Sequence, residues 1–172
     1  MPIGHYKDLG PCSVILNPDG TPAELNPTMG GVKMRDTLLF TKIVEDGMGE
    51  SAVSGVDKGR EVQLEVPMTR ASIARLNLVI YGSELVGSTL TVKNTVGNDF
   101  YSLAKKILIK PLVNNIASIT TSEWTHLWHC FPVVDQEIVY DNSEQRVAKI
   151  LFEVYPSQDT ARRGKFYQYG PD

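Results

Sequence analysis

Three side chains that often bind metal ions lie close together in residues 124–130, whose sequence is WTHLWHC. His126, His129 and Cys130 carry the nitrogen and sulfur donors that zinc prefers. The segment is typical of a β-strand, however, and the side chains of a strand alternate between its two faces. His126, Trp128 and Cys130 would then share one face, while His129 would point to the other. We therefore predict aromatic packing here and no metal site.

No other set of residues predicts a catalytic centre. The chain has three histidines, and no Gly-x-Ser-x-Gly motif frames a nucleophilic serine. The segment Asp46-Gly47-Met48-Gly49 begins like a calcium-binding loop, but acidic ligands do not follow at the required positions. Asp135, Glu137 and Asp141 form an acidic patch, which we interpret as a solvated loop. We expect neither an enzyme nor a bound cofactor.

The composition is that of a folded globular domain. The chain has 172 residues, of which 42% are hydrophobic and 22% charged, and this length suits a single domain spanning 1–172. A net charge of −3 gives no basic surface for reading nucleic acid. The N-terminus does not resemble a signal peptide, and no apolar run reaches the roughly 20 residues of a membrane-spanning helix. The sequence thus predicts a soluble protein made in the cytoplasm.

Two cysteines are too few for a disulfide framework. Free thiols are expected for Cys12 and Cys130 in a reducing cytoplasm, and a single bridge between them stays open as an alternative.

Alternation of apolar and polar residues predicts a mainly-β fold of about seven strands. It is clearest in residues 60–66, where three aliphatic and three polar side chains alternate: Val62, Leu64 and Val66 against Glu61, Gln63 and Glu65. Further strands are predicted over residues 12–17, 32–45, 124–134 and 145–155. Residues 89–96 and 100–110 are expected to pair as one hairpin across the turn Gly97-Asn98-Asp99, and Pro111 should end that hairpin.

One helix is predicted between the strands. Ile73, Leu76 and Ile80 recur at helical spacing. Thr69 is the expected N-cap residue, and Gly82 lies where a glycine often ends a helix.

Three segments do not fit regular elements: the N-terminal arm 1–11, the inter-strand loop 46–59 and the C-terminal tail 157–172. The loop is longer than the usual hairpin connection and mixes Met48, Val53 and Val56 with glycines, which suits a loop that folds onto a partner. The tail combines basic and aromatic residues, as single-strand nucleic-acid binders do. We interpret it as an arm that docks on a neighbouring subunit.

The order of these pieces resembles a known family. Residues 8–12 (DLGPC) lead into a short strand, and residues 29–32 (MGGV) open a long strand that ends in Glu45-Asp46-x-x-Gly49. A strand, one helix, a hairpin and two more strands follow, including residues 103–112 (LAKKILIKPL) and 146–154 (RVAKILFEV). Taken together, this order resembles the major tail tube proteins of long-tailed bacteriophages and gene-transfer particles.

The resemblance implies a β-sandwich or split barrel with one flanking helix. It also implies homohexameric rings that stack into a tube, with the inner sheets merging into one barrel around a channel for DNA. The implied location is the virion tail, assembled in the host cytoplasm. The implied partners are further copies of the chain, other tail proteins (terminator, distal tail or baseplate, tape measure) and DNA that passes without sequence recognition.

Within that family picture, specific residues receive roles. The contact between rings falls to loop 46–59, with the candidates Asp46, Gly47, Met48, Gly49, Val53 and Val56. Contacts between subunits fall to the two chain ends, with the candidates Arg162, Arg163, Phe166 and Tyr167. The polar strand face of Glu61, Gln63 and Glu65 lines either the channel or the outside of the tube, and the sequence leaves both open.

Two other readings remain. A tail terminator, a connector ring or a secretion-system tube subunit would share much of this pattern. A carbohydrate-binding β-sandwich would instead use Trp124 and Trp128 to stack on sugar rings.

Overall fold

A computed structural model describes residues 11–25, 31–44, 46, 51–69, 72–133 and 147–172. The strands are β1 (Cys12–Leu16), β2 (Ala23–Glu24), β3 (Lys33–Val44), β4 (Ala52–Thr69), β5 (Ser83–Val86), β6 (Thr89–Val92), β7 (Lys105–Val113), β8 (Ile116–Ala117), β9 (Thr125–Val133), β10 (Val147–Tyr155) and β11 (Tyr167–Tyr169). The helices are α1 (Ile73–Val79) and the short α2 (Phe100–Leu103), with a 3-10 turn at Thr121–Glu123.

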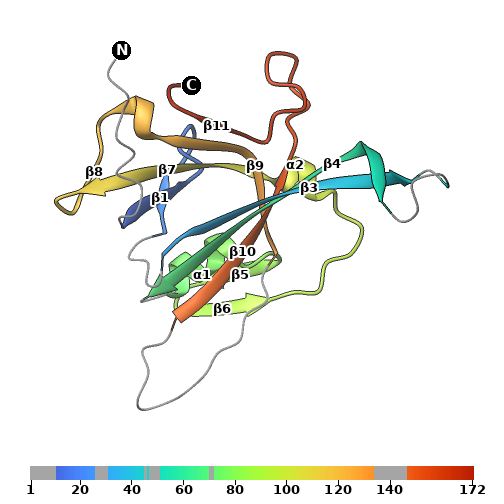
Figure 1. The fold of residues 1–172 in the computed structure, drawn as a ribbon. Coiled ribbons are helices and arrows are strands. Elements are labelled where there is room, and N and C mark those ends of the chain that lie inside the picture. The colour runs from blue at the N-terminus through green and yellow to red at the C-terminus, as the bar shows by residue number, and fades with distance from the viewer. Residues whose placement is uncertain (1–10, 26–30, 45, 47–50, 70–71, 134–146) are drawn as a thin grey trace.

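Most strands belong to one antiparallel sheet. The sheet has nine strands in the order β2-β1-β7-β9-β10-β4-β3, with β8 paired to β7 and β11 paired to β9, while β5 and β6 form a separate hairpin (Figure 1). The helix α1 contributes Val79 to the core. The prediction of a mainly-β fold with one flanking helix is confirmed.

One face of this sheet builds the hydrophobic core. In the register of β4 and β10, Val62, Leu64 and Val66 lie opposite Val154, Phe152 and Ile150, and all six are buried. The neighbouring strands add Val14, Leu16, Ile107, Leu127 and Cys130. Strict alternation in the sequence therefore marked the strands whose second face stays polar, as expected for a half-buried antiparallel sheet.

One edge of β9 pairs with two different strands. On the edge of β9 that faces away from β7, β11 pairs with residues 125–127 and β10 pairs with residues 129–133. The hydroxyl of Tyr167 in β11 donates a hydrogen bond of 2.7 Å to Asp36 in β3. This bond joins two strands that are not neighbours in the ladder, so the sheet curls around its core.

The predicted loop 46–59 is wrong for most of its length. Strand β4 begins at Ala52, and its first part pairs with β3 down to the pair Val44 and Ala52. Two irregularities in the register interrupt this part. Because it packs against no core, its residues do not alternate between apolar and polar, and the strand signal is missing from the sequence.

The predicted hairpin 89–110 is also wrong. Strand β6 pairs with β5 instead of β7, and the side chain of Asp99 caps α2 by accepting hydrogen bonds from the backbone of Tyr101 and Ser102. Strand β7 continues through Pro111 to Val113. Pro111 is tolerated because it lies opposite Cys12, the first residue of β1, where the ladder with β1 begins.

The helix itself is confirmed, but its ends differ from the prediction. The N-cap is Ser72, whose hydroxyl accepts a hydrogen bond from the backbone of Arg75, and Thr69 belongs to β4. The C-cap is Ile80. Gly82 has a φ of +75° and lies so close to Lys93 that a β-carbon would come within 2.7 Å of its carbonyl oxygen. The close approach of the segment after β6, rather than the end of the helix, therefore requires a glycine at this position.

The core position of Phe152 gives a direct test of this fold. We expect Phe152→Ala to lower the free energy of unfolding by about 3–5 kcal/mol, because the ring is fully buried and its loss leaves a cavity. Val96→Ala is the matched control, since Val96 is among the most exposed apolar residues, and we expect a change within about 0.5 kcal/mol. Urea unfolding measures both, and equal midpoints for the two variants would contradict the assignment of Phe152 to the core.

Candidate functional site

The strands β3 and β4 extend well beyond the core. Past Asp36 and Val62, residues 37–44 and 52–60 continue as a two-stranded ribbon, here called the arm, and every one of these residues is exposed. Figure 1 shows the arm projecting away from the rest of the sheet. A hairpin that leaves its sheet has no core of its own and is at best marginally stable in water.

The arm carries apolar side chains on both faces. Leu38, Phe40 and Val44 follow Met34 and Asp36 on the core side of β3, and Phe40 is 55% exposed. The other exposed apolar residues of the arm are Leu39, Ile43, Val53 and Val56. A contiguous set of exposed apolar side chains of this size marks a surface for interaction with another molecule.

The base of the arm is fixed by polar contacts. Arg60 forms an ion pair of 2.7 Å with Asp36, which also accepts the hydrogen bond from Tyr167. The backbone of Gly59, with a φ of +116°, donates a hydrogen bond of 2.7 Å to the carboxylate of Asp57. The turn around Lys58 therefore has a defined shape, and the arm leaves the body in one direction.

The residues predicted for the contact between rings fall partly on the arm. Val53 and Val56 belong to it and are exposed, and Asp46 lies exposed beyond the end of β3. Gly47, Met48 and Gly49 lie outside the described residues. The sequence missed Leu38, Leu39 and Phe40, although this apolar triplet inside a predicted strand already departs from alternation.

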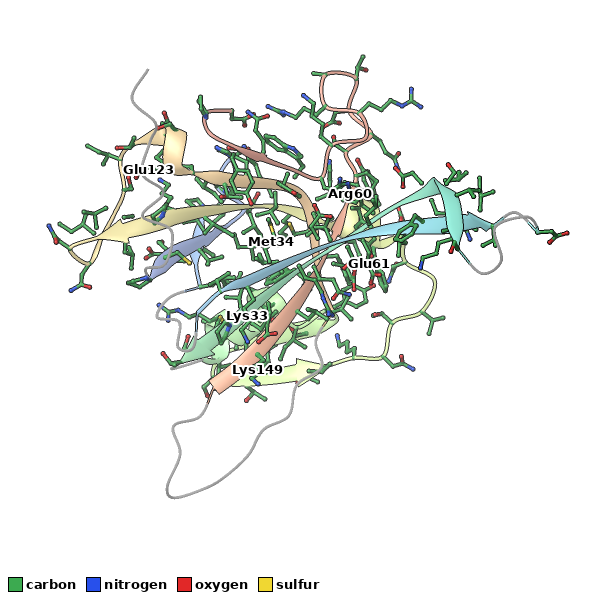
Figure 2. The ribbon with its side chains drawn as sticks, viewed as in Figure 1. Lys33, Met34, Arg60, Glu61, Glu123 and Lys149 are labelled. Atoms are coloured by element: carbon green, nitrogen blue, oxygen red, sulfur yellow. The ribbon has the colours of Figure 1, made fainter. Side chains whose placement is uncertain are left out.

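The predicted polar face of β4 forms as expected. Glu61, Gln63 and Glu65 point away from the core, and the amide of Gln63 donates hydrogen bonds to Glu61 at 3.0 Å and to Glu153 of β10 at 2.8 Å. The same face also carries Arg35, which lies opposite Gln63. Lys33 and Lys149 lie on it too (Figure 2). Its described charges therefore balance, and the surface is mixed rather than acidic.

The C-terminal tail folds back onto its own chain. Phe166 and Tyr167 pack against the core cluster. The guanidinium of Arg162 lies 4.2 Å from the centre of the Trp128 ring and forms an ion pair with Asp172. Arg163 is exposed. Of the four predicted subunit contacts in the tail, three thus make contacts within the chain, and their role between subunits stays a prediction.

The outer face of β9 shows where the metal-binding donors lie. Residues Leu127 and Cys130 both face the core, because one residue of β7 opposes two of β9 between the pairs Ile107–Leu127 and Lys105–Cys130. This bulge corrects the predicted alternation: Cys130 does not share a face with His126 and Trp128. His129 stacks on Tyr101 instead. Both cysteines are free, and burial raises the pKa of the Cys130 thiol.

His126 lies at the centre of a row of aromatic and cationic side chains. It stacks on Trp128 with 5.8 Å between ring centres, while Lys106 and Lys110 place their ammonium groups 5.0 Å from Trp128 and 3.9 Å from Trp124. Lys106 also binds Asp172 at 2.6 Å. His126 lines a groove of about 450 Å³ in this row.

The environment of His126 disfavours its charged form. The side chain is only 4% exposed, and neither ring nitrogen has a hydrogen-bond partner of standard geometry within the described part of the chain. Burial and then the charge of Lys106 lower its pKa, against the opposing effect of Asp172, Asp19 and the backbone of Gly170. The neutral ring is therefore the form that the fold accommodates.

Comparison with known proteins does not place the chain in a family. No protein-family model and no curated protein matches the sequence. Among the described residues, no helix combines the length and the apolar character needed to span a bilayer.

The buried histidine predicts a pH dependence of stability. Because the pKa of His126 in the folded chain lies below its ordinary 6.5, the unfolded chain binds more protons as the pH falls below about 6.5. Stability contributed by the neutral ring is therefore lost on acidification in that range. His126→Phe keeps the stacking and removes this loss, and it should also raise stability at neutral pH by about 1 kcal/mol because two unpaired nitrogens disappear.

Urea unfolding of the two proteins between about pH 5 and pH 8 measures the effect. The stability difference between variant and wild type should widen as the pH falls. Parallel curves over the whole range would show that His126 is not held neutral by the fold.

Proposed function

We propose that this protein is a self-assembling structural subunit and, specifically, a tail tube protein of a long-tailed bacteriophage. Hexameric rings of the chain stack into a hollow tube that conducts DNA during ejection. The observation that carries the proposal is the arm: a pair of long strands that leaves its own core and exposes apolar side chains on both faces.

The energetics of the arm favour a partner. Burying a large aliphatic or aromatic side chain completely is worth about 1.5–3 kcal/mol, and the arm holds several that are roughly half exposed. A contact that covers most of them therefore supplies several kcal/mol before the costs of association. In a single chain in water, this free energy is not realised.

The edges of the sheet support assembly with further copies. The sheet ends in β2 on one side and in β3 on the other. Open edges carry unpaired backbone groups that can pair with other chains, and closing a sheet around a ring removes them. Contacts within a ring close by rotation, whereas contacts between rings stay open and extend the assembly.

The mixed-charge face of β3, β4 and β10 suits the wall of a channel for DNA. A basic wall would hold the phosphates by releasing their counterions, while balanced charges bind them weakly. In the proposal, the face with Glu61, Gln63 and Glu65 lines the channel and lets DNA slide. The terminator, the distal tail or baseplate proteins and the tape measure protein are the expected partners at the ends and inside the tube.

A terminator or connector ring is the nearest alternative, and it differs in number: one ring per particle rather than many stacked rings.

The carbohydrate-binding reading is disfavoured by the two tryptophans. Trp128 is buried, and a cation lies over a face of each ring, so neither offers an open platform for a sugar.

The proposal predicts assembly that depends on the arm. The purified chain at high concentration should form rings or tubes in negative-stain images and scatter light with a mass well above 19.0 kDa. Phe40→Ser combined with Val56→Ser should shorten or abolish the tubes, because it removes exposed apolar area from both faces of the arm.

Val96→Ser is the matched control, since Val96 is exposed but lies outside the arm. It should assemble like the wild type, and at a concentration too low for assembly all three proteins should unfold at similar urea concentrations. A wild-type chain that stays a single molecule at high concentration would refute the proposal.

A further inference from the structure

A second exposed apolar surface lies at the end of the molecule away from the arm. It consists of the β7–β8 hairpin and the loop that follows it, here called the knob, with the exposed side chains Val113, Ile116 and Ile119. Ile116 is 71% and Ile119 90% exposed. Figure 1 shows β8 and the arm at opposite ends of the molecule.

The knob is held in shape by its own hydrogen bonds. Asn114 and Asn115 have φ angles of 53° and 63°, which is the geometry of a tight two-residue hairpin turn. The backbone of Ser118 donates to Pro111 at 2.8 Å, and its carbonyl accepts from the indole of Trp124 at 2.9 Å. Isoleucines fixed in this way can be covered by a partner with little loss of conformational freedom.

The arm offers a surface of matching character. Leu38 and Phe40 continue the row of Met34 and Asp36 that faces the core, but beyond the body nothing among the described residues covers that row. This face of the arm therefore lacks the second layer of apolar side chains that covers the same face within the body. Apolar side chains from outside the chain can supply that layer.

The charges of the two surfaces are complementary. Within residues 111–123 the only charged residue is Glu123, which is exposed beside the β8 end of the molecule (Figure 2). On the arm, Arg60 is paired with Asp36, and the charge of Lys58 is offset by the neighbouring Asp57. This leaves Lys42, which lies on the same face of β3 as Leu38 and Phe40 and forms no ion pair among the described residues. Lys42 of one copy can therefore pair with Glu123 of another.

We propose that the arm of one copy packs against the knob of a second copy, an inference that rests on the proposed function and names the surface that receives the arm. Each copy carries both surfaces at opposite ends, so a copy that has used its arm still presents its knob. The contact is heterologous and does not close, and it extends the assembly in one direction. A contact of arm with arm would instead be symmetric and would end with one pair of surfaces.

Two variants that are each defective on one side test this pairing. Phe40→Asp disables the arm and leaves the knob intact, whereas Ile116→Asp disables the knob and leaves the arm intact. Each variant alone should stop at the mass of a single ring, because every contact between rings would need the disabled surface. Mixed in equal amounts, an intact arm meets an intact knob once, and light scattering should show twice that mass and no further growth.

Both substituted side chains are exposed, so at a concentration too low for assembly each variant should unfold at the urea concentration of the wild type. Val96→Asp, which places the same charge outside both surfaces, should assemble as the wild type does. If the wild type forms tubes but the mixture does not double in mass, or if Ile116→Asp alone forms tubes, the pairing of arm and knob is wrong and self-assembly stands. If the wild type never assembles, both proposals fall.

Discussion

A β-strand must satisfy two demands: its backbone groups need hydrogen-bond partners, and its apolar side chains need cover from water. Strands β3 and β4 meet both demands only near the body, where Val62, Leu64 and Val66 pack in the core. Along the arm they meet the first demand with each other and leave the second unmet. The exposure of Phe40 and its neighbours is therefore a property of the topology, since a two-stranded ribbon has no interior.

The rest of the fold fixes where that ribbon points. Asp36 holds both Arg60 of β4 and Tyr167 of β11, and so ties the start of the arm to a strand on the far side of the curled sheet. The bulge in β9 turns Cys130 into the core and leaves His126 and Trp128 on the other face, where Arg162 of the C-terminal tail covers Trp128. The chain end thus braces the same body that carries the arm.

The sequence predicted the strands that have one face in the core, and it missed the strand residues that lie outside the core. Residues 60–66 and 147–155 alternate because one face is buried, and both lie in strands as predicted, while residues 145 and 146 lie outside the described residues. Residues 52–59 extend the same strand, but without a buried face their glycines and aliphatic residues have no period, so a loop was predicted. The pairing of β6 with β5 rather than β7, and the bulge in β9, depend on register, which composition does not record. Among the exposed apolar residues of the arm, the sequence predicted Val53 and Val56 as contact residues but not Phe40.

An exposed apolar arm risks uncontrolled aggregation, and this arm contains features that limit it. Two register irregularities, near Lys58 and near Val53, break the regular ladder, and Gly59 takes a backbone conformation that few other residues accept. Bulges of this kind increase the twist of a ribbon, so its free edge is not a flat template for added strands. Lys42 adds a charge between the apolar residues of β3. These features oppose pairing along the edge while leaving the faces of the arm open, so a partner has to fit the side chains rather than extend the sheet. In the proposed assembly, binding through a face of the arm, at one end of a molecule whose opposite end carries a rigid apolar hairpin, gives growth a direction and opposes sideways addition of copies.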